Sequence, residues 1–309
     1  MNSMNAAAVT DFGPAENLRT MQLPVPIPGP EEVQVKVAYA GVQPADAAAR
    51  AGWRLPGSSP SMPMVPGNDF SGVVTDVGSE VSSFEPGDEV LGYRMLGSYA
   101  EYLTVSADQL VPKPPSVGWA EAAALSASGQ TADTVLDALR VTAGETLLVH
   151  GAAGGVGSMV VQLAWNRAAV VIGTASPQNH AHLRQLGATP VSYGEGQLER
   201  IREAADGPIH AALDASGQGS LHIATQVVPD TSRIATIADP QLAEELGLQM
   251  LRSDRSAARL GRLVDLVSTG DLQMYIRRIY PLAEAAEAHR EIETGHGRGK
   301  VVLSIGGDL

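Results

Sequence analysis

The stretch HGAAGGVGS at residues 150–158 constrains the fold of this chain more than any other. It follows the apolar run TLLV and precedes MVVQLA, whose apolar spacing suits a helix. Ala152, Gly154 and Gly157 fit the pattern G-x-G-x-x-G with alanine in the first place. Such a loop presents free N–H groups and the positive end of a helix dipole to a pyrophosphate. The stretch predicts a dinucleotide-binding loop; the alternative is a tight turn without a ligand.

From about residue 118 onward, strand-like and helix-like runs alternate. Strand-like TLLVHG, AVVIGTA, AALDAS and RIATIA are separated by helix-like segments, which is typical of βαβ units and a parallel sheet. The first third instead holds short β-rich runs broken by Pro and Gly, which favours a compact β-barrel or sandwich. After residue 270 a strand, a helix and a last strand can return to that first domain. We therefore expect an α/β protein of two domains, as its 309 residues also favour.

The charge of the chain limits its partners. Lys and Arg total 21 against 34 Asp and Glu, a net charge of −13. This balance opposes the phosphate neutralisation on which nucleic-acid binding relies, and it disfavours anionic membranes. The sequence shows no basic N-terminal segment followed by a long apolar run, and no stretch long enough to span a bilayer. We expect a cytoplasmic protein that acts on a small-molecule substrate.

The choice between NAD and NADP depends on whether acidic residues follow the glycine loop. An NAD site usually places a carboxylate about 20 residues beyond the loop to hold the ribose 2′-hydroxyl. Residues 146–194 contain no Asp or Glu. Ser176, Asn179 and His180 offer hydrogen-bond donors there, and Arg184 is a nearby cation suited to a 2′-phosphate. NADPH is the expected cofactor; the alternative is that these polar residues only cap a helix.

Several motifs in a fixed order resemble one family. They are PVPIPGPEEVQVKV, AGVQPAD, GNDFSGVV, VGSEVSSFEPGDEVLG, HGAAGGVGS and RGKVVL. This set resembles the zinc-independent quinone oxidoreductase branch of the medium-chain dehydrogenase/reductase superfamily. The resemblance implies a GroES-like catalytic domain at residues 1–117, completed by 271–309, and a Rossmann NADP-binding domain with a doubly wound parallel sheet at 118–270. It also implies NADPH-dependent reduction of a quinone or an activated C=C bond.

Other functions fit the same resemblance. The chain is also similar to enoylreductase modules of polyketide assembly lines, and the fold alone does not choose among reactions. A non-redox step such as a cyclisation, or a nucleotide-bound binding protein, remains open. Relatives pair the outer strands of two Rossmann sheets, and the mostly apolar LGLQMLR at residues 246–252 suits such pairing. We therefore expect a homodimer.

No zinc is expected. The chain has no Cys, and Asn68 stands where zinc-dependent relatives carry a His ligand. The seven histidines show no metal-site spacing. Without a Lewis acid, hydrogen-bond donors must polarise the substrate carbonyl, and addition to an enone needs less polarisation than addition to an isolated ketone. This favours conjugate reduction.

The resemblance implies a catalytic amide at Gln43, where relatives usually carry Asn, and substrate-pocket positions at Trp53 and Asp133. A core-packing role for Trp53 is equally open, and Asp46 is expected to cap a helix. For Lys300, the alternative to a cofactor contact is a solvated lysine at a strand edge. Beyond Ala152, Gly154, Gly157 and the four residues of the 2′-phosphate region, the expected cofactor contacts are Thr131, Ala153, Gly155, Val156, Thr174, Tyr193, Ser216, Ile237 and Lys300.

Overall fold

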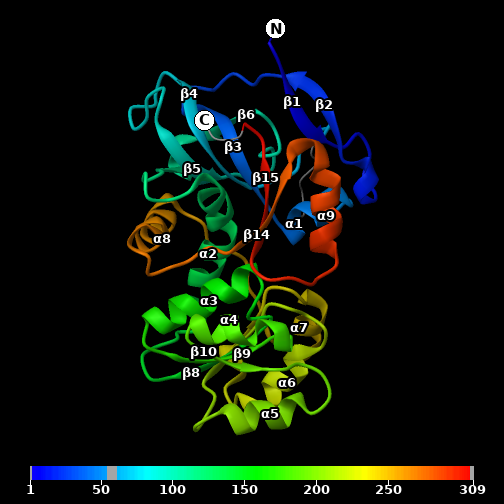
Figure 1. The fold of residues 1–309 in the computed structure, drawn as a ribbon, viewed down its shortest axis with the longest axis vertical. Coiled ribbons are helices and arrows are strands. Elements are labelled where there is room, and N and C mark those ends of the chain that lie inside the picture. Colours follow the sequence, from blue (N-terminus) through cyan, green and yellow to red (C-terminus); the bar gives the residue numbers. More distant parts are fainter. Residues whose placement is uncertain (1, 54–60, 307–309) are drawn as a thin grey trace.

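The computed structural model describes residues 2–53 and 61–306. Figure 1 shows an elongated molecule with a mixed β-rich part at the end that carries the N-terminus and a parallel sheet at the other end. Helices α2 (Trp119–Ala138) and α3 (Gly155–Asn166) lie where the two parts meet. The glycine loop and the RGKVVL segment meet at this junction.

The parallel sheet has six strands in the order β10-β9-β8-β11-β12-β13. The chain starts at a central strand, builds outward on one side, and then returns to build the other side, which is the doubly wound Rossmann order. This confirms the expected fold class. The strands are β8 (Thr146–His150), β9 (Val170–Thr174), β10 (Ala188–Val191), β11 (Ala211–Asp214), β12 (Ile234–Thr236) and β13 (Gln249–Met250).

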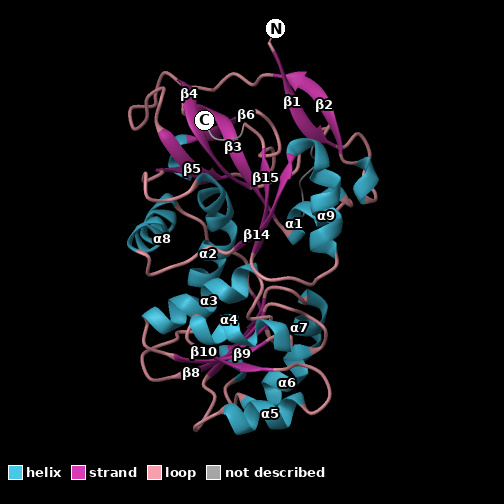
Figure 2. Cartoon of the chain, in the orientation of Figure 1, coloured by secondary structure: helices cyan, strands magenta, loops and turns pink. Residues whose placement is uncertain are grey.

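Helices cover both faces of this sheet (Figure 2). Alternate residues of the fully buried strand β8 point to opposite faces, so Leu147 and Val149 pack in one apolar cluster and Leu148 in another. The first cluster includes residues of α2 and α3, and the second includes residues of α5, α6 and α7. The surrounding helices are α4 (His180–Gln185), α5 (Gln197–Ala204), α6 (Ser220–Val227) and α7 (Pro240–Leu246).

The β-rich part contains a seven-stranded sheet and a two-stranded one. In the larger sheet the path is β14-β15-β3-β4-β5-β7, and β6 also pairs with β3. These strands are β3 (Glu32–Val42), β4 (Asp69–Val77), β5 (Glu89–Tyr93), β6 (Tyr102–Ser106), β7 (Leu110–Pro112), β14 (Ile276–Pro281) and β15 (Lys300–Ser304). The smaller sheet pairs β1 (Ser3–Ala8) with β2 (Arg19–Pro24).

The last strand returns to the first domain's sheet. β15 runs antiparallel to β3, with Val301 opposite Val42, and parallel to β14. Helices α1 (Pro44–Arg50) and α9 (Ala285–Glu293) pack together beside this sheet, and α2 packs against β3, β4, α3 and α8 (Ala257–Thr269). α2 is rich in Ala, Ser and Gly, so the strands and helices around it approach its backbone closely.

Two histidines are buried in this fold. His289 on α9 has no exposed surface, and its Nε2 lies 3.2 Å from the Tyr99 hydroxyl. Burial lowers the pKa of His289 to about 3, with the charge of Arg50 acting in the same direction. Burial likewise lowers the pKa of His150, at the end of β8, to about 4. In the unfolded chain each would titrate near pH 6.5, so each stabilises the fold above that pH and progressively less below it.

We expect His289→Gln to weaken the pH dependence of folding. The wild type should lose about 1–2 kcal/mol more unfolding free energy than this variant between pH 7 and pH 5, because His289 must otherwise stay neutral. Urea unfolding at both pH values measures the difference. The exposed His222, replaced by Gln, is the control and should follow the wild type. An identical pH dependence in His289→Gln would contradict the assignment.

Candidate functional site

The glycine loop joins β8 to α3 at the carboxyl edge of the parallel sheet. A Cβ added to Gly157 would lie 2.2 Å from the Gly151 carbonyl oxygen, so only glycine permits the close packing of α3 on this turn. A Cβ on Gly154 would meet only that same oxygen, at 3.3 Å. The outer side of Gly154 is therefore open, next to the N–H groups of the first turn of α3, which have no partner within the helix. This cradle fits the pyrophosphate expected from the sequence.

Other predicted cofactor residues lie at the same edge of the sheet. Thr174 ends β9, and its hydroxyl accepts a hydrogen bond from Gly151 N at 3.3 Å. Ser216 follows β11 and donates to the buried Asp214 carboxylate from its backbone N–H, at 2.9 Å. Ile237 follows β12, and its N–H donates to the Asp214 carbonyl oxygen at 3.0 Å. The structure thus brings the loops after β8, β9, β11 and β12 together, as a dinucleotide site in this fold requires.

The predicted 2′-phosphate residues follow β9. Ser176 and Asn179 stand at N-cap positions, yet neither side chain makes a capping hydrogen bond. Instead the Asn179 amide donates to the Ser176 hydroxyl at 3.0 Å, so the capping alternative finds no support. His180 lies with Nε2 3.3 Å from the Ala175 carbonyl oxygen. The Arg184 side chain is exposed in the last turn of α4.

One cation near this region, Arg200, was not predicted from the sequence. The Arg200 guanidinium donates to the Ser192 carbonyl oxygen at 3.0 and 3.2 Å, beside the half-exposed Tyr193. Arg200 belongs to α5, beyond the acid-free stretch on which the prediction was based. The signal in the sequence was weak: Arg200 stands in the first turn of the helix-like segment that follows Tyr193.

Lys300 lies where the β-rich sheet meets the glycine loop. The N–H of Gly299 donates to the Ala153 carbonyl oxygen at 2.9 Å, and the N–H of Lys300 donates to the Tyr275 carbonyl oxygen at 2.8 Å. A Cβ on Gly155 would come within 2.8 Å of the Lys300 side chain, so that side chain lies against the start of α3. Lys300 is only 4% exposed. The alternative of a solvated strand-edge lysine is therefore wrong.

Gln43 links this lysine to a buried carboxylate. Its Oε1 accepts a hydrogen bond from Lys300 Nζ, and its Nε2 donates to Asp69 Oδ2 at 2.9 Å. Its backbone N–H donates to Asp46 Oδ2 at 2.8 Å, which closes a capping box at the start of α1. The expected capping role of Asp46 is confirmed. The Gln43 amide is held at both ends within the protein, so its role as the catalytic donor stays a prediction.

A buried polar network surrounds Gln43. Asp69 Oδ2 also accepts from the N–H of Ala127 at 2.7 Å, and Arg255 Nη1 lies 3.5 Å from Asp69 Oδ1. Arg255 donates to the Asn68 side-chain oxygen at 3.2 Å, and the Asn68 amide donates to Asp46 at 3.1 Å. Burial raises the pKa of Asp69, against the opposing charges of Arg255 and Lys300. Burial also raises the pKa of Asp46 to about 7.

Asp69 and Arg255 were not predicted as site residues. Asp69 stands in the apolar strand NDFSGVV. A carboxylate in a buried strand needs hydrogen-bond or ion-pair partners, so its presence there could have marked Asp69 as a candidate site residue. Arg255 comes from a segment 186 residues away in sequence, which no local pattern connects to Asp69. Its guanidinium also lies over the Tyr93 ring, 5.7 Å from the centroid.

Trp53 and Thr131 lie in different environments. Trp53 follows α1 and is 54% exposed, so core packing does not explain it, and its role in a substrate pocket stays a prediction. Thr131 is half-buried on α2, next to the buried Gln130, whose side-chain oxygen accepts from Ser256 N at 2.8 Å. The segment that carries Arg255 is thereby attached to α2.

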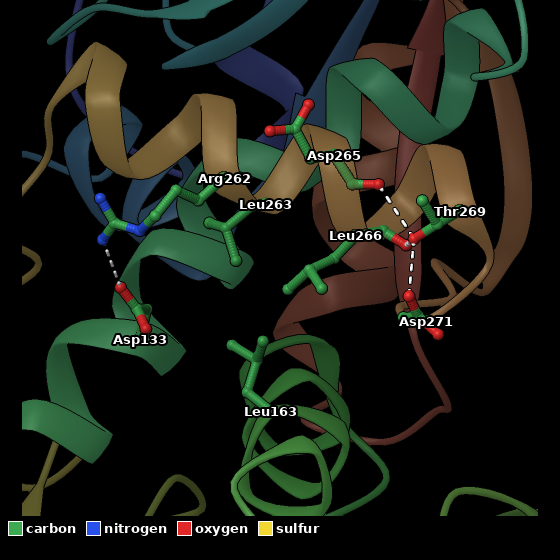
Figure 3. Close-up of a pocket in the computed structure, with 8 residues that line it drawn as sticks. All are labelled: Asp133, Leu163, Arg262, Leu263, Asp265, Leu266, Thr269 and Asp271. Carbon is green, nitrogen blue, oxygen red and sulfur yellow. Dashed lines mark hydrogen bonds and ion pairs between the residues drawn. The ribbon is translucent and has the colours of Figure 1, made fainter.

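Asp133 lies in a different environment from the one expected. It pairs with Arg167 at 2.7 Å, Arg259 at 2.8 Å and Arg262 at 3.3 Å, tying α2 to α3 and α8. Figure 3 shows it pointing toward Arg262 at one side of a groove of about 430 Å³. The groove is lined by Asp133, Leu163, Arg262, Leu263, Asp265, Leu266, Thr269 and Asp271. Neither Gln43 nor Lys300 borders it, so these contacts lend no support to a substrate-pocket role for Asp133.

Two further findings concern metals and membranes. Among residues 2–53 and 61–306, no three or more His, Cys, Asp or Glu side chains are grouped so that they could hold a metal ion. Over the same ranges, none of the helices has the length and apolar character needed to cross a membrane.

A β-rich sheet joined to a doubly wound sheet, with a glycine loop at the junction, defines a two-domain nicotinamide-dependent type of oxidoreductase fold. Residues 29–115 match the family model of the alcohol dehydrogenase GroES-like domain, and residues 186–303 match that of the zinc-binding dehydrogenases. The chain belongs to the quinone oxidoreductase-like branch of the medium-chain dehydrogenase/reductase superfamily and is an oxidoreductase. The second family model is named for zinc, although this chain has no Cys.

Individual relatives support this assignment over the full length. The quinone oxidoreductase of Mus musculus is 30% identical and covers 98% of both chains. An NADPH-dependent alkenal/one oxidoreductase of Arabidopsis thaliana chloroplasts is 31% identical over 97% of this chain and 79% of its own. The solved structure of the quinone oxidoreductase from Coxiella burnetii superposes with a TM-score of 0.87, at 31% identity over 98% of this chain and 99% of its own.

We expect Asp133→Asn to destabilise the fold without changing substrate affinity. Weakening three partly buried ion pairs should lower the unfolding free energy by about 1–3 kcal/mol. Urea unfolding measures this, and the KM for the oxidised substrate should stay within twofold. Asp265→Asn, at an exposed position of the same groove, is the control and should change neither quantity. A changed KM with unchanged stability would return Asp133 to the substrate pocket.

Proposed function

We propose that this protein is an NADPH-dependent reductase of an activated C=C bond or a quinone, and that it works without a metal. The observation that carries this proposal is the junction itself, where the amide of Gln43 and the ammonium of Lys300 lie beside the glycine loop. The Lys300 ammonium, held by the Gln43 side-chain oxygen, is a donor that can stabilise negative charge developing on a substrate oxygen. The relatives named above act on quinones and alkenals, which share a conjugated carbonyl.

The cofactor preference rests on charge. A carboxylate after β9 would repel a 2′-phosphate, and residues 146–194 contain none. Ser176 and Arg184 supply a hydroxyl and a cation instead, and Arg200 adds a second cation after β10. The Arabidopsis relative is NADPH-dependent by name. When bound, the cofactor supplies a hydride; the glycine loop would hold its pyrophosphate.

The absence of cysteine favours metal-free chemistry. Zinc sites of dehydrogenases rely on thiolate and imidazole ligands, and here Gln43 and Asn68 form part of a hydrogen-bonded network with Asp46, Asp69 and Arg255. Hydrogen bonds polarise a carbonyl less than a metal ion does. Conjugated acceptors, whose reduction needs less polarisation, suit such a site better than isolated ketones.

The assembly and the domain limits are also proposals. β13 is the edge strand of the parallel sheet, and Met250 on it is 40% exposed. An unpaired edge of this kind can pair with a second copy across a two-fold axis. We propose a homodimer formed there, and domains spanning 1–117 with 271–309, and 118–270.

We expect NADPH to bind at least tenfold more tightly than NADH. Arg184→Ala should weaken NADPH binding by about ten- to hundredfold, the range for losing a hydrogen bond to a charged group, and leave NADH binding unchanged. Fluorescence titration of both cofactors measures this. Arg19→Ala, on β2, is the control and should alter neither affinity. Equal dissociation constants of the wild type for the two cofactors would contradict the proposal.

We expect the purified protein to oxidise NADPH with quinones and enones after exhaustive chelation, and to be at least a hundredfold slower with saturated ketones. The absorbance of NADPH and the reduced product, measured together, should change one to one. No oxidation with any acceptor would favour a non-redox or binding role on the same fold. Activity that returns only with added zinc would contradict the metal-free mechanism.

A further inference from the structure

We propose that Lys300 is the proton donor of the reaction and that Gln43 is a positioning residue that holds the Lys300 ammonium in place. This inference rests on the proposed reductase function. The family resemblance implied a hydrogen-bond donor at Gln43, whereas this proposal places a proton donor at Lys300 and makes Gln43 its hydrogen-bond acceptor.

The first argument is the direction of the Gln43 amide. Asp69 Oδ2 accepts from Gln43 Nε2 at 2.9 Å and from Ala127 N at 2.7 Å, so the amide nitrogen is directed toward the carboxylate. Its oxygen then faces Lys300 Nζ, which can only donate. The opposite amide orientation would place oxygen against carboxylate and nitrogen against ammonium. The charges on both sides therefore fix Gln43 as an acceptor for Lys300.

The second argument is the donor capacity of Lys300. An ammonium carries three N–H bonds. Within the part of the chain that the structure describes, Nζ donates to Gln43 Oε1 and, at 3.5 Å, to the carbonyl oxygen of Val42. One N–H remains, on a side chain that lies against Gly155 at the start of the cofactor loop. Lys300 is thus a cation with a proton to give at the place where cofactor and substrate are expected to meet.

The third argument is the charge around Lys300. Asp69 on β4, Asp46 on α1, Arg255 before α8 and Arg277 on β14 act on it. Burial lowers the pKa of Lys300 to about 8; the two carboxylates oppose this shift and the two arginines add to it. The group is therefore protonated at pH 7 and gives up its proton more readily than an exposed lysine. An acid whose pKa lies near the working pH is suited to general acid catalysis.

The proton step balances as follows for an enone. A bound cofactor would supply a hydride, with two electrons, to the β-carbon, and the π pair of the C=C bond would move into an enolate. Lys300 then breaks one Nζ–H bond, its proton forms the new bond to the α-carbon, and the electron pair stays on nitrogen. A proton from solvent water restores the ammonium. The products are the saturated carbonyl compound and NADP⁺.

The small number of lysines makes a direct measurement possible. The chain has three, Lys36, Lys113 and Lys300, so the Cε signals of ¹³C-labelled lysine can be assigned by substitution. We expect the Lys300 signal of the NADPH-free protein to titrate near pH 8. Gln43→Ala should shift this midpoint, because the acceptor is lost. A Lys300 midpoint near the ordinary value of about 10.4 would overturn the proposal.

Kinetics separate a proton donor from a cofactor contact. Lys300→Met should lower kcat by a hundredfold or more, within the range of general acid catalysis, while the NADPH dissociation constant stays within threefold. In the wild type kcat should fall as pH rises through the Lys300 pKa, and this fall should be absent in Lys300→Met. Gln43→Ala should lower kcat less than Lys300→Met does, and should shift the pH at which kcat falls. Added methylamine should partly restore turnover to Lys300→Ala.

The controls distinguish this inference from the proposed function. Lys36→Met, at a half-buried position of β3, should keep the kcat and pH profile of the wild type. Lost NADPH binding in Lys300→Met with an unchanged kcat at saturation would make Lys300 a cofactor contact and overturn the proposal. Full turnover in that variant overturns it as well. If the wild type fails to oxidise NADPH with any of the quinones or enones tested, the reductase function is refuted, whatever the lysine titration shows.

Discussion

The contact between the RGKVVL segment and the glycine loop is the constraint on which the rest of the site depends. One backbone hydrogen bond, from Gly299 N to Ala153 O, joins the β-rich sheet to the turn that begins α3. The next residue, Lys300, then enters the β-rich sheet as the first residue of β15. Because both partners are backbone groups in glycine-rich turns, the start of β15 and the glycine loop approach closely at this point. The chemistry-bearing side chains are gathered around this point.

The cost of burying charge explains the network beside that contact. Asp46, Asp69 and Lys300 are almost fully buried, and isolated ions in such a place would be strongly destabilising. The protein compensates with Arg255 and with the amides of Gln43 and Asn68, which connect the carboxylates to the cations. Such a network stabilises little by itself compared with an apolar core. Its position next to the glycine loop is what is expected of functional rather than structural polar groups.

Patterns local in sequence predicted much of the fold. Spacing and composition predicted the glycine loop, the alternation of strands and helices, and a last strand able to return to the first domain, whereas the doubly wound Rossmann sheet was implied by the family resemblance. The loops after β8, β9, β11 and β12, in which the sequence motif and the family resemblance placed cofactor contacts, lie together because parallel strands end at one edge. The partners of individual charges were not predictable in this way. Arg255 reaches Asp69 across 186 residues, and Asp133 binds arginines from two other helices, so only the folded chain defines their roles.

The position of β15 has a consequence for the order in which the molecule is made. The six parallel strands are contiguous in sequence, so this part can fold as soon as it leaves the ribosome, whereas the β-rich sheet is complete only after β14 and β15 have been made. Until Val301 pairs with Val42, that end of β3 keeps an open edge, the kind of surface that promotes aggregation. Lys300 arrives with the same strand. Synthesis therefore completes the site late, and a chain cut just before Lys300 would carry the glycine loop but no buried ammonium beside it.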